Sequence, residues 1–510
     1  MAITGRPRTY LTGFLSWRWR DYALLAALSV LISAANVAWR LEETRPPDWD
    51  MGRHLGDSIA YLRRLQHLDL KGFLTDYHYY PPFISYVVDP FYLVFGTEMW
   101  VAVLANALWV ALLAWSTYGI GRVIWSPMIG LLATVFLLAT PMFVGQFKRY
   151  MLDAPLSAIV ALAIYLLILN QEFSNRRLSI VLGVVMGCGM LAKWTFPMVL
   201  GLPLAYALGR GLWLAWRSGE VERAKNAAIS LAITAVIAGP WYLTNAQKIY
   251  NNITVTSSGR VDPPVWSMAS NVRYFWLMVD HQLYVVPFVL FLVGVGFLFF
   301  KREALGRQKY LLLLILGTYV LFTFVQNKND RYTMPMLVGV AMIAVYWLSY
   351  VKTLPRLAVS SGIIAYSVVA FVAMSFGIGF LDREDTFDLG GHEFVLYLQR
   401  GGGAGPPVDV QWYQAEVFQA IHDDGLQPRT VFYDNQAGDN PGYFSGGGIR
   451  FYTLKYDLTL VTAKKNPNYI LIRDKQPPTL PAGFELIEQH VLPNKNYVVV
   501  LRRVATLDDN

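Results

Sequence analysis

Long apolar stretches recur along roughly the first 380 residues of the chain, each near the ~20 residues that a helix needs to cross a bilayer. We place about eleven of them, with shorter polar segments between. Their predicted bounds are 22–40, 99–121, 125–145, 153–170, 178–193, 197–215, 226–243, 283–300, 309–326, 332–350 and 357–381. The pattern predicts an all-α polytopic membrane protein.

Basic residues are unevenly distributed over the segments that connect these stretches. Alternate connections carry dense basic charge: Arg6, Arg8, Arg18, Arg20, Arg176, Arg177, Arg217, Arg223, Lys225, Lys301, Arg302, Arg307, Lys309, Lys352 and Arg356. The positive-inside rule places this set in the cytoplasm. The N-terminus is therefore predicted to be cytoplasmic. Because the number of spans is odd, the C-terminal segment is predicted to be extracytoplasmic.

The opposite set of connections contains fewer cations, and these stand beside polar residues: Lys148, Arg149, Lys193, Arg260, Lys328 and Arg331. The positive-inside rule does not explain them, so they invite a functional interpretation. Asp153 follows the Lys148–Arg149 pair at the start of a predicted span. Taken alone, it is well explained as a helix cap before Pro155. With the cations beside it, the arrangement indicates a site for an anionic group.

The first external loop, about 41–98, is much longer than a simple connection and is expected to have structure of its own. Segment 51–66 predicts an interfacial helix, because Met51, Leu55, Ile59 and Leu62 share one stripe. Asp50, His54, Asp57 and Tyr61 share another face. Two alternatives remain open for the acids: Asp50 as a helix N-terminal charge, and Asp48 as a solvated acid. His54 lacks the companion spacing of a metal ligand and is better explained as an interfacial polar residue.

The composition changes after Leu381, where the chain becomes charged and rich in glycine and proline, including GGGAGPP at 401–407. A helix is predicted at 409–424, and strands at 430–435, 468–474 and 496–503. Two domains follow from this change. Residues 1–381 form the membrane domain, which includes the first external loop, and residues 382–510 form a small extracytoplasmic α/β domain.

Overall composition supports a membrane protein, since 55% of the residues are hydrophobic and only 15% are charged. The net charge of +8 does not indicate nucleic acid, because the predicted cytoplasmic loops account for most basic residues. The single cysteine, Cys188, excludes an intramolecular disulfide.

An ordered set of sequence motifs then gives a more specific indication of the protein family that this chain resembles. YPPF at 80–83 ends the polar part of the first external loop, and YMLDAPLSAIVALAIYLL, GMLAKWTFP, PWYLTN and KNDRYTMP follow in that order. This set resembles the GT-C superfamily of membrane glycosyltransferases, in particular the bacterial branch of the protein O-mannosyltransferase and lipid A aminoarabinose-transferase families. The resemblance covers about residues 20–380. It implies the GT-C fold and a location in the bacterial inner or plasma membrane.

The resemblance also implies an activity, the inverting transfer of a sugar from a polyprenyl-phosphate donor to a hydroxyl acceptor on the extracytoplasmic side. The acceptor is a lipid, a glycan or a protein. Asp50 matches the proposed base of the first loop, and Asp153, Lys193 and Arg331 match further required positions. This sequence departs from the motif pattern of those families at two positions. Asp-Met replaces a pair of adjacent acids, which leaves Asp48, Asp50 and Asp57 as alternatives. Tyr80 replaces a lysine that often precedes the two prolines.

The expected chemistry suits these residue types. A carboxylate deprotonates the acceptor hydroxyl, and arginine or lysine stabilises the charge on the leaving phosphate. These cations can replace a metal, so no obligate metal is expected, and only an incidental divalent ion near His54 is left open. The candidate substrate-binding residues are Lys148, Arg149, Lys193, Lys328, Arg331, Tyr80, His54 and Tyr242.

A secondary transporter or lipid flippase is the alternative, because it also explains many spans and some boundary charges. We rank it lower for two reasons. Transporters place ionisable residues near the bilayer midplane, whereas the charges here gather at one interface, and no inverted repeat is visible. A non-catalytic scaffold that displays the C-terminal domain would require the external charges to be coincidental.

Overall fold

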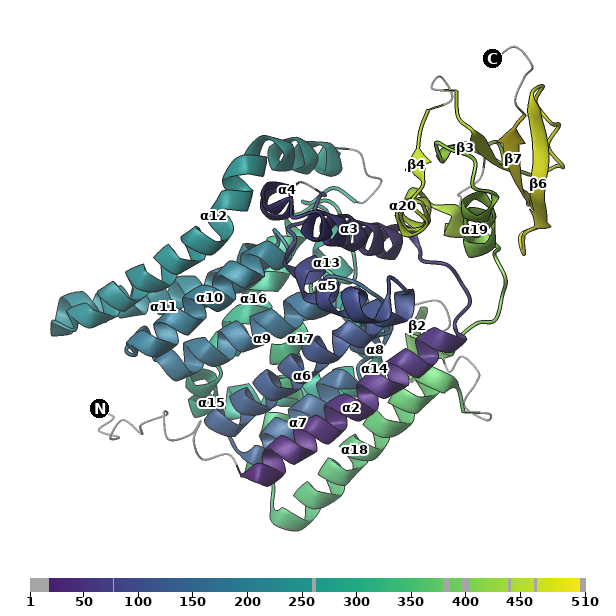
Figure 1. Cartoon of the computed structure of the whole chain (residues 1–510). Coiled ribbons are helices and arrows are strands. Elements are labelled where there is room, and N and C mark those ends of the chain that lie inside the picture. Colours follow the sequence, from purple (N-terminus) through teal and green to yellow (C-terminus); the bar gives the residue numbers. More distant parts are fainter. Residues whose placement is uncertain are drawn as a thin grey trace. The chain divides into compact units, whose positions relative to one another are not determined.

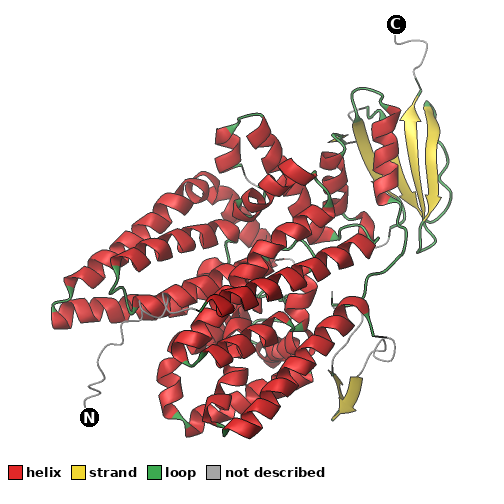
Figure 2. Cartoon of the chain, turned by 60° about the horizontal axis from the view of Figure 1, so that its bottom comes forward, coloured by secondary structure: helices red, strands yellow, loops and turns green. Residues whose placement is uncertain are grey.

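The computed structural model of the chain describes residues 18–76, 78–258, 263–378, 386–396, 404–438, 442–462 and 466–504. Arg6, Arg8, Arg260 and the glycines at 401–403 therefore lie outside the described residues. The chain forms two compact units. The first comprises Met1–Val37, Leu74–Ile84 and Val103–Pro406, and the second comprises Ala38–Phe73, Ser85–Ala102 and Pro407–Asn510. Helices dominate, and most of the strands belong to one small sheet (Figure 2).

The first unit is built almost entirely from helices, which Figure 1 labels in chain order. Helices α2 (Trp19–Glu42), α5 (Phe83–Phe95) and α6 (Met99–Ile124) contribute residues to both units. The first unit contains α7 (Pro127–Leu138), α8 (Pro141–Phe147), α9 (Asp153–Asn170), α10 (Arg176–Ala192), α11 (Phe196–Ser218), α12 (Val221–Ser258), α13 (Met268–Leu277), η1 (Met278–Leu283), α14 (Val285–Phe300), α15 (Arg302–Arg307), α16 (Lys309–Thr323), η2 (Met334–Met336), α17 (Leu337–Tyr346), η3 (Trp347–Tyr350) and α18 (Thr353–Phe376).

Each predicted span coincides with one or more of these helices, but their lengths differ from the prediction. Among the described residues, 6 helices are long and apolar enough to cross a membrane, or up to 7 if the pair α7 and α8 is one span. That pair is bent by 65°, at a break where Pro141 begins the second helix and cannot donate a backbone hydrogen bond to the first. Other predicted spans correspond to shorter apolar helices such as α14 and α16. The structure therefore confirms the polytopic helical fold but not the count of about eleven.

Charged connections that the sequence places in the cytoplasm meet at one end of the helices of the first unit. Lys309 Nζ lies 2.6 Å from a carboxylate oxygen of Glu172, which follows α9. Arg223 Nη1 donates to the carbonyl oxygen of Glu172 at 3.0 Å. The start of α2 and the end of α6 are joined by Asp21 and Arg122 at 2.7 Å. These contacts hold the charged side chains at the ends of the helices that carry them.

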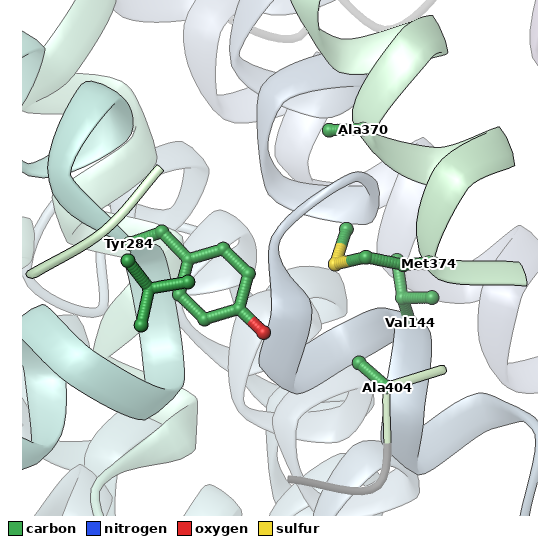
Figure 3. Packing of buried hydrophobic residues seen from close by; sticks show 6 residues of the cluster. Val144, Tyr284, Ala370, Met374 and Ala404 are labelled. Carbon is green, nitrogen blue, oxygen red and sulfur yellow. The ribbon is translucent and has the colours of Figure 1, made fainter. Parts of the chain in front are cut away.

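A buried apolar cluster joins α8, α18 and the residues that follow α18 (Figure 3). It contains Val144, Tyr284, Ala370, Met374, Val395 and Ala404. Beside it, the ammonium group of Lys148 donates to the carbonyl oxygen of Met374 at 2.6 Å. The short hairpin β1 (Thr386–Leu389) and β2 (His392–Val395) supplies Val395 to this cluster. Val395 and Ala404, which follow α18 in the sequence, are therefore packed into the first unit.

The second unit combines the first external loop with most of the C-terminal segment. Its remaining elements are α3 (Trp49–Gln66), most of α4 (Leu70–Thr75), α19 (Gln414–Asp424), η5 (Gly442–Phe444), α20 (Gly446–Lys455) and the strands β3 (Thr430–Asn435), β4 (Thr459–Leu460), β5 (Tyr469–Asp474), β6 (Phe484–Val491) and β7 (Tyr497–Arg503). The strand order is β4-β3-β5-β7-β6. Strand β3 pairs in parallel with β4 and β5, whereas β7 pairs antiparallel with β5 and β6.

The predicted loop helix is present as α3, but it is more deeply buried than its pattern indicates. Met51, Leu55, Ile59 and Leu62 are buried as the apolar stripe requires. His54, Asp57 and Tyr61 on the other face are buried as well. Helix α20 of the C-terminal segment packs directly on α3, which supplies part of this burial. An amphipathic pattern alone does not reveal such a partner.

The packing of α14 on α17 gives a test of the helical unit. A methyl group at Gly294 would overlap the carbonyl oxygen of Ile343, whereas one at Gly296 on the same helix would meet nothing within 4 Å. We expect Gly294→Ala to destabilise the protein by about 1–3 kcal/mol, because overpacking displaces backbone. Gly296→Ala should leave its stability unchanged or raise it by up to about 1 kcal/mol, because alanine favours a helix more than glycine does. Thermal unfolding in detergent, followed by tryptophan fluorescence, checks this. Equal midpoints for both variants would contradict the packing.

Candidate functional site

Three side chains from separate segments meet where helices of the first unit end. Asp153 is the first residue of α9, Lys193 directly follows α10, and Arg331 lies between α16 and α17. The Lys193 ammonium lies 2.6 Å from one carboxylate oxygen of Asp153. Arg331 Nη1 lies 3.8 Å from the other. The sequence predicted that these residues share one side of the membrane domain, and the structure brings them together.

This cluster is buried, and its charges do not cancel. The side chains of Asp153 and Lys193 are 3% and 4% exposed, and that of Arg331 is 16% exposed. Isolated charges are very costly to bury, but a carboxylate shared between two cations offsets part of that cost. One carboxylate and two cations leave an excess of one positive charge among the three groups. Such a cluster is suited to hold an anion.

Aromatic rings surround the Lys193 ammonium. Its Nζ atom lies 5.3 Å from the ring centre of Tyr80 and 5.4 Å from that of Tyr332, within the range of a cation–π interaction. Trp194 stacks against Tyr80 with an interplanar angle of 15°. Tyr80, which stands where the resembling families often have lysine, therefore contributes an aromatic face to the cluster. Sequence reasoning did not identify Tyr332 and Trp194 as its companions, although the KW and RY dipeptides are the signal for them.

Helix α12 fixes two backbone segments near this cluster. Trp241 Nε1 and Asn245 Nδ2 donate to the carbonyl oxygens of Asp76 and Thr75, at 3.1 and 2.9 Å. These contacts hold the segment that leads to Tyr80. The Tyr242 hydroxyl donates to the carbonyl oxygen of Met190 at 2.9 Å, near the end of α10. The PWYLTN motif thus supports the segments that present Tyr80 and Lys193.

Two other predicted phosphate ligands bond to the backbone. Lys328 Nζ donates to the carbonyl oxygens of Phe322, Thr323 and Val325 at 3.2, 2.6 and 2.6 Å, which caps the end of α16. An ammonium group has three donors, so these contacts use its donor capacity. Lys148 Nζ donates to Met374 and Gly405 at 2.6 and 3.4 Å. Arg149 is half-buried, and the Asn106 amide binds its carbonyl oxygen at 3.0 Å.

The first-loop acids occupy distinct environments in the second unit. Asp48 is the N-cap of α3 and accepts from the Met51 backbone N–H at 3.3 Å, so it is more than a solvated acid. Asp50 lies in the first turn of α3 and is half-buried. Asp57 Oδ1 accepts from Arg450 Nε at 3.0 Å. His54 is buried on the same helix.

The described residues contain no group of three or more His, Cys, Asp or Glu side chains that could hold a metal ion.

Comparison with known proteins gives matches in both sequence and fold. Residues 80–242 match the family model described as dolichyl-phosphate-mannose-protein mannosyltransferase. This segment contains Tyr80, Asp153, Lys193 and Tyr242 but neither Asp50 nor Arg331. No curated protein sequence matches the chain.

Two solved structures share the fold over nearly the whole chain. ArnT from Cupriavidus metallidurans bound to undecaprenyl phosphate has a TM-score of 0.61 and 17% identity, over 94% of this chain and 97% of its own. Its apo state has a TM-score of 0.60 and 16% identity, over 96% and 98%. These matches confirm the GT-C fold and the resemblance to GT-C membrane glycosyltransferases that the motifs indicate.

The environment of Asp57 predicts a dependence of stability on pH. Burial raises the pKa of the Asp57 carboxyl to about 7, and the Arg450 guanidinium opposes that increase. The pKa of aspartate in an unfolded chain is about 3.9. Between these pH values the folded protein keeps a proton that the unfolded chain releases, so the free energy of unfolding falls as pH rises from about 4 to 7.

Asp57→Asn removes this titration. We expect the variant to gain thermal stability relative to the native protein as pH rises from 5 to 8. Unfolding midpoints of both proteins, measured across that range, check the difference. A difference that does not change with pH would contradict the assignment.

Proposed function

We propose that this protein transfers a sugar from a polyprenyl-phosphate donor to a hydroxyl acceptor on the extracytoplasmic face of the membrane, with inversion at the anomeric carbon. The observation that supports this most is the buried Asp153–Lys193–Arg331 cluster with its excess positive charge. The same fold in a protein bound to undecaprenyl phosphate adds support, because a lipid phosphate is the anion that such a cluster suits.

In the proposed reaction, Arg331 and Lys193 bind the donor phosphate, with Arg149 as a further contact. Negative charge builds up on that phosphate as the glycosidic bond breaks, and cations already in place stabilise it without reorganisation. Asp153 acts as a positioning residue, since each of its carboxylate oxygens faces a different cation. Lys148 and Lys328 support the surrounding backbone.

The proposed base is Asp50, which accepts the proton of the acceptor hydroxyl as the new glycosidic bond forms. Asp48 and Asp57 were the alternatives from the sequence. Asp48 accepts from the backbone as a helix cap, and Asp57 accepts from Arg450. These contacts give structural roles to Asp48 and Asp57, and Asp50 is proposed because it matches the position of the base in the resembling families. Protein cations take the place of a metal, and the lipid-linked sugar is the only cosubstrate besides the acceptor.

The proposed setting is the bacterial inner membrane, with the N-terminus in the cytoplasm and the C-terminal domain outside. The acceptor is a lipid, a glycan or a protein that carries a free hydroxyl group. The hydroxyl and the sugar are left general, because the residues that support the proposal bind the phosphate, which all polyprenyl-phosphate donors share.

Release of radiolabelled sugar from undecaprenyl-phosphate mannose and undecaprenyl-phosphate aminoarabinose, by the purified protein in vesicles, tests this function. We expect Asp50→Asn and Arg331→Met each to slow release about 100-fold or more, because they remove the base and a phosphate contact. Lys225→Met is the matched control, since that exposed cation lies at the start of α12 and pairs with Glu222. Its rate should equal that of the native protein.

Two outcomes would contradict the proposal. One is native-like release by both Asp50→Asn and Arg331→Met. The other is movement of the intact labelled donor across the vesicle membrane without any release of sugar, which would favour the transporter or flippase alternative.

A further inference from the structure

Helix α20 of the C-terminal segment begins with three glycines, Gly446, Gly447 and Gly448. Ser445 caps the helix, and its hydroxyl accepts from the Gly448 backbone N–H at 3.3 Å. Successive glycines weaken a helix, because they lose more backbone freedom on folding than other residues. Three glycines in the first turn of α20 therefore call for a contact that offsets this loss of helix stability.

That contact is the first turn of α3. A methyl group at Gly447 would overlap the carbonyl oxygen of Trp49 and would lie 3.0 Å from the backbone nitrogen of Arg53. From the other side, a methyl group at Gly52 would lie 2.5 Å from the carbonyl carbon of Gly447. The two backbones therefore touch where no side chain can fit. Asp50 stands between Trp49 and Arg53 in this turn.

The contact continues along both helices, and the order of the contacting residues shows that the two helices run in the same direction. Beyond the glycines, Arg450 donates to Asp57 at 3.0 Å. Further on, Arg63 Nη1 lies 3.0 Å from Asp457, and the Arg63 guanidinium also donates to the carbonyl oxygen of Leu454. Helix α3 is thus held by α20 from its first turn to its last.

We propose that α20 positions the proposed base, so that the C-terminal α/β domain is part of the catalytic machinery. This inference rests on the proposed function. Gly447 acts through Asp50: because its backbone abuts the first turn of α3, it sets where that turn lies and hence where the carboxylate lies. Gly447 is a positioning residue and contacts no substrate itself. A shift of about 1 Å in a reacting group can slow catalysis about 100-fold.

The three glycines provide their own control. A methyl group at Gly446 would meet nothing within 4 Å, so Gly446→Ala changes the same helix turn without the clash. We expect Gly447→Ala to lower kcat for sugar release from undecaprenyl-phosphate donors about 10- to 100-fold, with KM for the donor unchanged. Gly446→Ala should match the native protein within about twofold. Equal kcat values for the two variants would overturn the inference, whether or not Asp50→Asn is inactive.

A double variant separates positioning from general damage. Because Gly447 acts through Asp50, adding Gly447→Ala to Asp50→Asn should change the residual rate by less than about threefold. The inference would be overturned if Gly447→Ala lowered the rate by the same factor in the native protein and in Asp50→Asn. It would also be overturned if Gly447→Ala lowered the rate while Asp50→Asn was fully active. Absence of release by the native protein would overturn the proposed function and, with it, this inference.

If Gly447→Ala does not yield folded protein, Gly56→Ala gives a milder version of the same displacement. Its methyl group would lie 3.1 Å from the Cγ atom of Arg450 and 3.4 Å from the Phe451 backbone nitrogen. We expect kcat to fall about three- to tenfold, with KM for the donor unchanged. A native kcat in this folded variant would overturn the inference.

Discussion

The burial of the Asp153 carboxylate between two cations is the constraint on which the rest of this site depends. A charge in a low-dielectric interior is tolerated only when a partner is held close. Asp153, Lys193 and Arg331 come from three separate segments of the chain, so the ends of the helices that carry them must meet at one place. The aromatic rings of Tyr80 and Tyr332 then surround the Lys193 ammonium. The surplus of positive charge is what makes this place a candidate for a lipid phosphate.

Cations on the same side of the helical unit have different partners, and the partner separates the cations with structural roles from those proposed to bind phosphate. Lys328 and Lys148 bond to carbonyl oxygens that helix ends and loops leave unsatisfied. Lys193 and Arg331 instead face one shared carboxylate. At the other end of the helices, Lys309 pairs with Glu172 and Arg122 with Asp21. The charges of these two pairs are therefore neutralised locally.

The sequence predicted the helices well, because long apolar runs and the sorting of basic residues are local signals. The same sorting was enough to place Asp153, Lys193 and Arg331 on one side. It did not predict that Lys148 and Lys328 bind carbonyl oxygens, because backbone partners leave no mark in the sequence. The sequence patterns did not predict helix α5, which lies inside the first external loop. They also did not predict α20, β4 and β6 in the C-terminal segment. The Asp57–Arg450 pair joins residues 393 positions apart, and no local pattern reveals such a contact.

The most direct test of the Asp153 cluster as a phosphate site is an experimental map of the full-length protein with undecaprenyl phosphate bound. We predict phosphate oxygens within about 3.5 Å of the Lys193 ammonium and the Arg331 guanidinium, with Asp153 still between the two cations. A phosphate bound at the other end of these helices, beside Arg223 or Lys309, would contradict this assignment.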